Sequence, residues 1–289
     1  MTPPLHTGVH SETVVTDWSL RQTRCRMVLT NPWALPRARR VLRAHLLGLD
    51  QALALRPRRS LLGRLRHDRW RPEVAALLKD VLGEHPTGRV GRFPYGLVAA
   101  PADASPHRPR RETWELAVET AALSDRVGLQ LDPGTTPRAW SAQRCAEAIA
   151  EATYCGVLIA LGGDVATSGL APIGGWHVAV DDPVFERDDT AVVTIDGGAV
   201  STLTTVGEHG APDRPELRPV VAPLTGRVVE PVWRSVTVIA ADATAANAAC
   251  VAALVRGRDA VTWLDRTGLP ARLVSVDGTV VTAGGWPVG

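Results

Sequence analysis

The stretch from Gly156 to Gly169, Gly-Val-Leu-Ile-Ala-Leu-Gly-Gly-Asp-Val-Ala-Thr-Ser-Gly, constrains the fold more than any other part of the chain. Its short apolar run, Val157 to Leu161, is rich in branched side chains and stops abruptly at Gly162-Gly163-Asp164. This pattern predicts a buried strand that delivers two glycines and a carboxylate to a sheet edge. Adjacent glycines let backbone N–H groups approach a ligand, and such groups bind anions well. The alternative is that the three residues form only a turn.

The composition is typical of a folded globular protein. With 289 residues, of which 45% are hydrophobic, the chain is long enough to bury a sizeable core in one large mixed domain. No apolar run approaches the roughly 20 residues needed to span a bilayer, so we expect no membrane association. The N-terminal residues have neither the basic nor the apolar region of a secretory signal, which predicts a cytoplasmic protein.

Charge, lysine and cysteine usage exclude several classes of function. The net charge is only +2, so no overall field attracts nucleic acid. Lys79 is the only lysine, which excludes mechanisms that need a Walker, Schiff-base or kinase lysine elsewhere. The eight histidines show no H-E-x-x-H pattern, so we expect no zinc site. The cysteines are scattered without a C-x-x-C pair, and we expect small buried side chains at Cys25, Cys145, Cys155 and Cys250.

Apolar spacing predicts helices and strands that do not alternate strictly. We expect residues 1–17 to form a flexible lead and residues 18–289 to form a single domain, with an irregular excursion at 83–111. Helices are predicted over 35–49, 72–81, 113–123, 138–153 and 244–255. Strands are predicted at 18–29, 128–132, 157–161, 176–180, 191–195, 199–205 and 233–240, with a closing hairpin of 271–276 and 279–282. This mixture indicates the α+β class.

The loop before the helix at residue 138 is a second candidate anion site. Gly134, Thr135 and Thr136 supply N–H and hydroxyl donors just before a helix N-terminus, where the helix dipole favours anions. Arg138 is able to grip a phosphate with two hydrogen bonds. The alternative is that Thr135 or Thr136 is only the N-cap, Pro137 is the first helical residue and Arg138 is solvated.

Taken in order, several motifs resemble the ApbE family of flavin transferases, particularly its actinobacterial members. The resemblance extends from about Trp18 to Trp286, and it rests on the order and spacing of the motifs rather than on any single one. The motifs are Cys25-Arg26 with Thr30-Asn31-Pro32, Leu131 to Trp140, Gly162-Gly163-Asp164 with Gly174-Gly175-Trp176, Pro223 to Gly226, Trp233 to Val238, Ala245 to Ala249, Gly268 to Leu273, and Gly284-Gly285-Trp286.

The resemblance implies an enzyme that binds FAD and Mg²⁺ and moves FMN onto a threonine or serine of an acceptor flavoprotein, releasing AMP. It implies an α+β fold of mixed and antiparallel sheets with packed helices and a ligand cleft between two halves. Asp164 would orient its loop or accept a ribose hydroxyl. The positions implied for the flavin nucleotide are Thr135, Thr136, Arg138, Gly162, Gly163, Asp164, Ser201, Thr202 and Thr204.

The sequence departs from the family pattern where the metal is expected. The positions implied for the metal are Pro137 and Asn247, but the family has an aspartate at 247 and a threonine where this chain has Val251. Asparagine brings an oxygen without charge, and valine cannot bind a cation. Other departures are an aspartate replaced by Gln143, a lysine replaced by Arg138, and a histidine and an aspartate replaced by Pro219 and Ala222. The alternative function is therefore a relative that binds a flavin nucleotide or a partner protein without transfer.

The arginine-rich segment from Arg56 to Arg71 supports a third hypothesis, an adaptor for nucleic acid or an acidic partner. A solvated surface explains the same residues more simply, and we expect no nucleic-acid partner.

Overall fold

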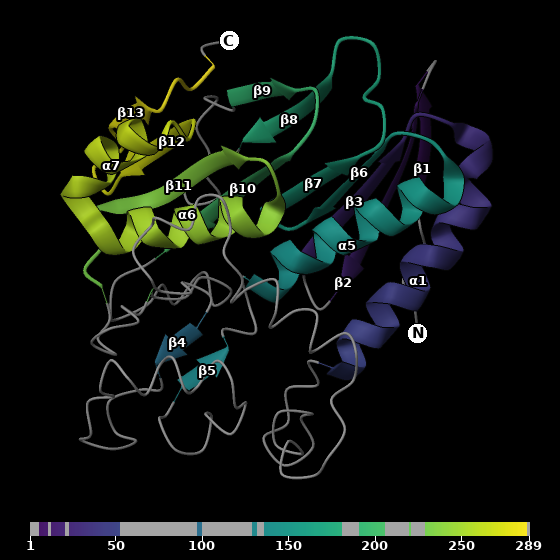
Figure 1. Cartoon of the computed structure of the whole chain (residues 1–289), viewed down its shortest axis with the longest axis horizontal. Coiled ribbons are helices and arrows are strands. Elements are labelled where there is room, and N and C mark those ends of the chain that lie inside the picture. The colour runs from purple at the N-terminus through teal and green to yellow at the C-terminus, as the bar shows by residue number, and fades with distance from the viewer. Residues whose placement is uncertain are drawn as a thin grey trace.

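The structure is a computed structural model that describes residues 6–10, 13–20, 23–52, 97–99, 129–131, 136–180, 191–205, 220 and 229–287. Within these ranges a nine-stranded sheet forms the centre of the molecule, in the order β1-β2-β3-β6-β7-β10-β11-β12-β13, and all its neighbouring strands are antiparallel (Figure 1). The strands are β1 (His6–His10), β2 (Thr13–Leu20), β3 (Thr23–Leu29), β6 (Val157–Leu161), β7 (Asp164–Ser168), β10 (Ala199–Thr204), β11 (Trp233–Ala240), β12 (Ala271–Ser275) and β13 (Val280–Ala283).

Two further pairs of strands and four α-helices complete the described part. β4 (Leu97–Ala99) pairs with β5 (Leu129–Leu131), and β8 (Trp176–Val180) pairs with β9 (Ala191–Ile195). The helices are α1 (Leu35–Ala52), α5 (Thr136–Thr153), α6 (Ala243–Arg256) and α7 (Ala260–Thr267), with 3₁₀ turns at Pro32–Ala34 and Gly257–Asp259. None of the described helices is both long and apolar enough to cross a membrane.

Helices α5 and α6 lie along one face of the sheet, with α1 beside α5 (Figure 1). Helix α5 packs on β6 and β7, and α6 packs on β10 and β11. The two helices also contact each other, so they meet above the boundary between β7 and β10. Any polar side chain that points to this face from the start of β7 is therefore enclosed by both helices.

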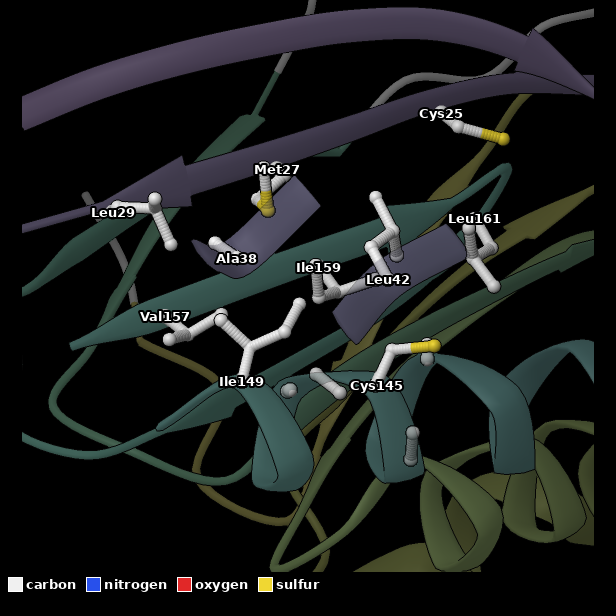
Figure 2. Packing of buried hydrophobic residues seen from close by; sticks show 14 of the residues in the cluster. Cys25, Met27, Leu29, Ala38, Leu42, Cys145, Ile149, Val157, Ile159 and Leu161 are labelled. Carbon is white, nitrogen blue, oxygen red and sulfur yellow. The ribbon is translucent and has the colours of Figure 1, made fainter. Parts of the chain in front are cut away.

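The core under α5 follows from the two-residue period of the strands. Met27 of β3 and Val157 and Ile159 of β6 are fully buried, and they point toward Cys145 and Ile149 of α5 (Figure 2). Side chains at alternate strand positions face the opposite way. The alternate residues Leu158, Val165 and Val200 therefore belong to a different cluster, with Trp176 and Val178 of β8. The β8–β9 hairpin thus covers the face of the sheet that the helices leave open.

Most of the predicted elements in the described ranges are confirmed. The α+β class with antiparallel strands is correct, and all four cysteines are free and buried. Ten predictions match an observed element within a few residues. For the helices, 35–49 matches α1, 138–153 matches α5 and 244–255 matches α6. For the strands, 128–132 matches β5, 157–161 matches β6, 176–180 matches β8, 191–195 matches β9, 199–205 matches β10 and 233–240 matches β11, and the final hairpin matches β12–β13. Some predictions lie outside the described residues. They are the helices at 72–81 and 113–123, most of the excursion at 83–111, and the segment from Arg56 to Arg71.

Three features differ from the predictions. Residues 6–10 and 13–17, expected to belong to a flexible lead, form β1 and part of β2, because the alternating Val14 and Thr16 side chains are buried. The single strand expected at 18–29 is two strands, β2 and β3, whose connection carries no glycine, proline or asparagine signal. The sequence analysis also missed α7, which has only eight residues.

Candidate functional site

The Gly-Gly-Asp segment is the turn between β6 and β7. Both are internal strands of the sheet, and the turn lies at the edge where they end. Gly162 has a φ of +63°, which favours glycine. The N–H of Thr202 donates to the Gly163 carbonyl at 2.8 Å, and a Cβ on Gly163 would lie 2.3 Å from the carbonyl oxygen of Thr202. Both glycines are therefore required by the backbone of the sheet itself.

Asp164, the first residue of β7, is completely buried beneath α5 and α6. Its Oδ1 accepts hydrogen bonds from Ser201 Oγ at 2.7 Å and from Asn247 Nδ2 at 3.0 Å. Its Oδ2 accepts one from Arg138 Nε at 3.2 Å. Both carboxylate oxygens therefore have charged or polar protein partners, as a buried carboxylate requires.

Each partner of Asp164 comes from a different element, positioned by regular structure. Ser201 is directly opposite Asp164 in the antiparallel pairing of β7 and β10. Arg138 is in the first turn of α5, and Asn247 is on the buried face of α6. We name Arg138, Asp164, Ser201 and Asn247 the buried polar cluster. It joins both helices to the centre of the sheet.

Helix α6 packs on β10 and β11 with a buried face that consists largely of alanine. Asp242 caps its N-terminus, where the carboxylate accepts a hydrogen bond from the Ala245 N–H at 2.7 Å. Gln143 Oε1 accepts a hydrogen bond from the Ala243 N–H at 3.1 Å and so ties α5 to the first turn of α6. The amide at position 143 thus holds the two helices in register above the cluster.

The cluster places one positive charge at the rim of a buried site. Burial raises the pKa of Asp164, and the nearby Arg138 charge and the hydrogen bonds from Ser201 and Asn247 act in the opposite direction. The Arg138 side chain is 35% exposed. Its guanidinium lies beside the β6–β7 turn, 3.9 Å from where a Cβ on Gly162 would be. The salt bridge to Asp164 uses Nε of this guanidinium, and one terminal nitrogen lies beside the glycine turn.

The structure brings together only part of the residues predicted for the site. Arg138, Asp164, Ser201 and Asn247 form the cluster, and Gly162 and Gly163 form the adjacent turn. Thr136 begins α5, but its side chain, the side chain of Pro137 and the whole of Thr135 lie outside the described residues.

Thr202 and Thr204 are not brought into the cluster. Successive side chains on a strand point to opposite faces, so Ser201 faces the helices while Thr202 and Thr204 face the other side. The Thr202 hydroxyl is 3.0 Å from the Thr237 hydroxyl on β11. Only the backbone of Thr202 reaches the site, through its contact with Gly163.

Sequence reasoning missed Gln143 as a tie between helices, and it missed Cys250. The Cys250 thiol donates to the Ser201 carbonyl at 3.2 Å, and burial, with a smaller effect of the Asp164 charge, raises the pKa of this thiol. A signal for Cys250 existed, because Cys250 is one of the few polar residues, with Thr244 and Asn247, among the buried alanine and aliphatic residues of α6.

The side chains at the implied metal position do not fit a magnesium ion. Magnesium requires oxygen ligands in octahedral geometry. The Asn247 amide nitrogen donates to Asp164, and Val251 packs in the apolar cluster under α6. Within the described ranges, no group of three or more histidine, cysteine, aspartate or glutamate residues is placed to hold a metal.

Comparisons of the sequence with family models and with known proteins point to the same family. The sequence model of the ApbE family matches residues 90–285. The chain is 29% identical over 157 residues to the FAD:protein FMN transferase of Escherichia coli (strain K12) and 28% identical to that of Salmonella typhimurium. Each match covers 53% of this chain and 45% of the relative, so the matched segment is about half the length of these relatives.

Solved structures show the same fold over nearly the whole chain. The ApbE protein of Thermotoga maritima superposes with a TM-score of 0.63 at 21% identity, covering 97% of each chain. The flavinyl transferase ApbE of Pseudomonas stutzeri in its apo form superposes with a TM-score of 0.62 at 18% identity, covering 96% of this chain and 95% of that one. Because the family model matches about two thirds of the residues, and the fold agrees, this chain belongs to the ApbE family.

Proposed function

We propose that this protein is an FAD:protein FMN transferase, which moves FMN from FAD to a threonine or serine of an acceptor flavoprotein and releases AMP. Support comes from family membership and from the relatives that are named for this activity. The observation that carries the proposal is the Arg138 guanidinium, fixed by the buried Asp164 beside the Gly162-Gly163 turn. A fixed cation next to a glycine turn is suited to an anionic diphosphate.

The reaction needs little covalent chemistry from the protein. The acceptor hydroxyl oxygen forms a bond to the FMN phosphorus, the bridging P–O bond breaks with its electron pair remaining on AMP, and the hydroxyl proton is released. Such transfers depend mainly on in-line positioning and on neutralising the charge of the non-bridging oxygens. Arg138 is the residue of the cluster that supplies this charge, and its two terminal nitrogens match the spacing of phosphate oxygens.

The other residues of the cluster act indirectly. Ser201 and Asn247 hold the carboxylate of Asp164, and Asp164 holds Arg138, so we assign these three as positioning residues. Thr135, Thr136, Gly162 and Gly163 remain proposed contacts to the nucleotide through backbone N–H groups and hydroxyls. Thr202 and Thr204 remain candidates only for a contact from the opposite face of the sheet, and a metal at Pro137 stays a prediction from the sequence. The cytoplasmic location and the organisation of the chain as a single domain also stay predictions.

The direct test is transfer itself. The purified protein is incubated with FAD and an acceptor protein that carries the family's target motif, and the acceptor is analysed by intact mass spectrometry and in-gel flavin fluorescence. We expect acceptor that carries covalent FMN, with AMP formed in equal amount. An acceptor in which the target residue is alanine is the control and should remain unmodified.

Two other outcomes are distinguishable. FAD binding without covalent transfer would replace the enzyme with the alternative function, a nucleotide-binding relative. If the protein does not bind FAD at all, both the transferase function and the nucleotide-binding alternative are overturned.

A further inference from the structure

The surroundings of Asp164 are those of a completed charge pair rather than of a cation site. Three groups point hydrogen atoms at its two oxygens, namely Ser201 Oγ, Asn247 Nδ2 and Arg138 Nε. Asn247 Nδ2 also lies 3.4 Å from Ser201 Oγ. A metal ion at this carboxylate would have to displace donors that now satisfy it, in a site with no exposure to water at Asp164 or Asn247.

The next turn of α6 offers nothing to a cation. Val251 is one helical turn beyond Asn247, and it is buried among apolar side chains such as Val236 and Leu254. The nearest titratable group on the same face is the Cys250 thiol, which already donates to the Ser201 carbonyl. Toward Asp164 and Ser201, α6 therefore presents the Asn247 Nδ2 and Cys250 thiol donors, and its next turn presents the apolar Val251, whereas magnesium needs oxygen ligands.

Arg138 already places a positive charge at this point. Its Nε is bound by Asp164, which restrains the plane of the guanidinium and leaves its two terminal nitrogens outside this salt bridge, on a side chain that is 35% exposed. A guanidinium held in this way is pre-organised for two parallel hydrogen bonds to an oxyanion. It also repels a divalent cation placed next to it.

From this arrangement we propose that Arg138, held by Asp164, takes the place of a divalent cation at Asn247, so that this protein binds the diphosphate of FAD without magnesium. The identity of the ligand as FAD rests on the proposed function. The absence of a cation site around Asn247 does not depend on that function, because it follows from the contacts of Asp164 and from the apolar packing of Val251.

The first experiment measures FAD affinity by isothermal titration calorimetry with the full chain, in magnesium and in EDTA. The dissociation constants should agree within about twofold. Arg138→Gln should weaken binding about 10- to 100-fold in both buffers, because one charge-assisted contact is lost. Arg144→Gln is the matched control on the same helix, since within the described residues Arg144 pairs with the exposed Glu147 and not with the cluster, and it should bind as the wild type does. A loss of affinity of more than about tenfold on adding EDTA to the wild type would overturn the proposal.

The second experiment needs no FAD. Mn²⁺ binding to the wild-type protein is followed by electron paramagnetic resonance, and thermal unfolding is measured with and without Mg²⁺. The wild type should show no stoichiometric Mn²⁺ binding and no Mg²⁺-dependent change in Tm. Stoichiometric, tight Mn²⁺ binding or a Tm raised by Mg²⁺ would overturn the proposal.

The variant Asn247→Asp sharpens this result. It places a second carboxylate against Asp164, so its Tm should fall and should recover in part when Mg²⁺ is added. Asn31→Asp, at an exposed cap, is the matched control and should show neither effect. If FAD fails to bind in either buffer, the proposed function falls, while the Mn²⁺ and Tm results still decide whether a cation site exists.

Discussion

The two faces of β10 show how neighbouring residues of similar chemistry come to have different roles. Ser201 faces the helices, is fully buried and binds the carboxylate of Asp164, whereas Thr202 faces the other way and meets only another threonine hydroxyl. On that other face the adjacent positions are apolar, with Val165 and Val200 packed against the β8–β9 hairpin. The helix-covered face therefore carries the buried polar cluster, and the opposite face combines apolar packing with the contact between two threonine hydroxyls. A residue's place in the two-residue period decides its role.

The largest expected effect comes from breaking the polar cluster at its centre. Asp164→Ala leaves Arg138, Ser201 and Asn247 with unsatisfied donors in a buried site, and it should lower the free energy of unfolding by about 3 to 5 kcal/mol. Urea denaturation measures this. Asp17→Ala breaks the exposed ion pair with Arg26 and should change the same quantity by only about 0 to 1 kcal/mol. Equal effects of the two substitutions would show that the burial of Asp164 does not matter.

A somewhat smaller effect is expected at the turn that brings Asp164 into place. Gly163→Ala puts a Cβ 2.3 Å from a backbone carbonyl of β10, so the two strands must shift apart, at about 1 to 3 kcal/mol. Gly197→Ala, in the turn between β9 and β10, meets nothing within 4 Å and should leave stability unchanged. Chemical denaturation of both variants tests the comparison, and a neutral Gly163→Ala would contradict the close approach of β7 and β10.

The comparison of faces is tested directly by a pair of neighbouring substitutions. Ser201→Ala removes a donor from the buried carboxylate and should lower the free energy of unfolding by about 1 to 2 kcal/mol. Thr202→Ala removes a half-buried contact between hydroxyls and should have an effect of about 0.5 kcal/mol. The order of the two values, measured by urea denaturation under one condition, is the result that counts, and the reverse order would mean that the faces are misassigned.

The smallest effect is expected far from the cluster, in the exposed β12–β13 turn. Hydrogen bonds from Ser275 and from the Thr279 N–H lower the pKa of Asp277 from 3.8 to about 2. Because the folded state has the lower pKa, Asp277 stabilises the protein above pH 3.8, and this contribution is lost as the pH falls toward 2. The Tm difference between wild type and Asp277→Asn should therefore shrink over this interval. A difference that is constant between pH 2 and 5 would contradict the lowered pKa.

The sequence was sufficient for most of the regular structure near the site, because its signals are local. The apolar run that ends at Gly162 predicted β6, and the periodic apolar residues after Arg138 predicted α5. The turn between β2 and β3 was missed, because residues 21–22 carry no turn signal, and α7 was too short to show a period. Both elements were missed because local sequence patterns are a limited guide to structure.

The site itself was only partly predictable. Arg138, Asp164, Ser201 and Asn247 were each identified, but their mutual contacts depend on the pairing of β7 with β10 and on how close α6 lies to the sheet, and neither can be read from spacing. Thr202 was grouped with Ser201 because a run of hydroxyls on a strand looks uniform in sequence. Its assignment to the opposite face required knowing which alternate positions the helices cover.

The account depends most on the claim that the Arg138 guanidinium, fixed by Asp164, contacts the diphosphate of FAD. Phosphorus NMR of FAD tests this most directly, because it observes the two phosphorus atoms themselves. On binding to the wild type both resonances should shift, and with saturating Arg138→Gln these shifts should be largely lost, while Arg144→Gln should retain them. The same shifts in Arg138→Gln as in the wild type would contradict the claim.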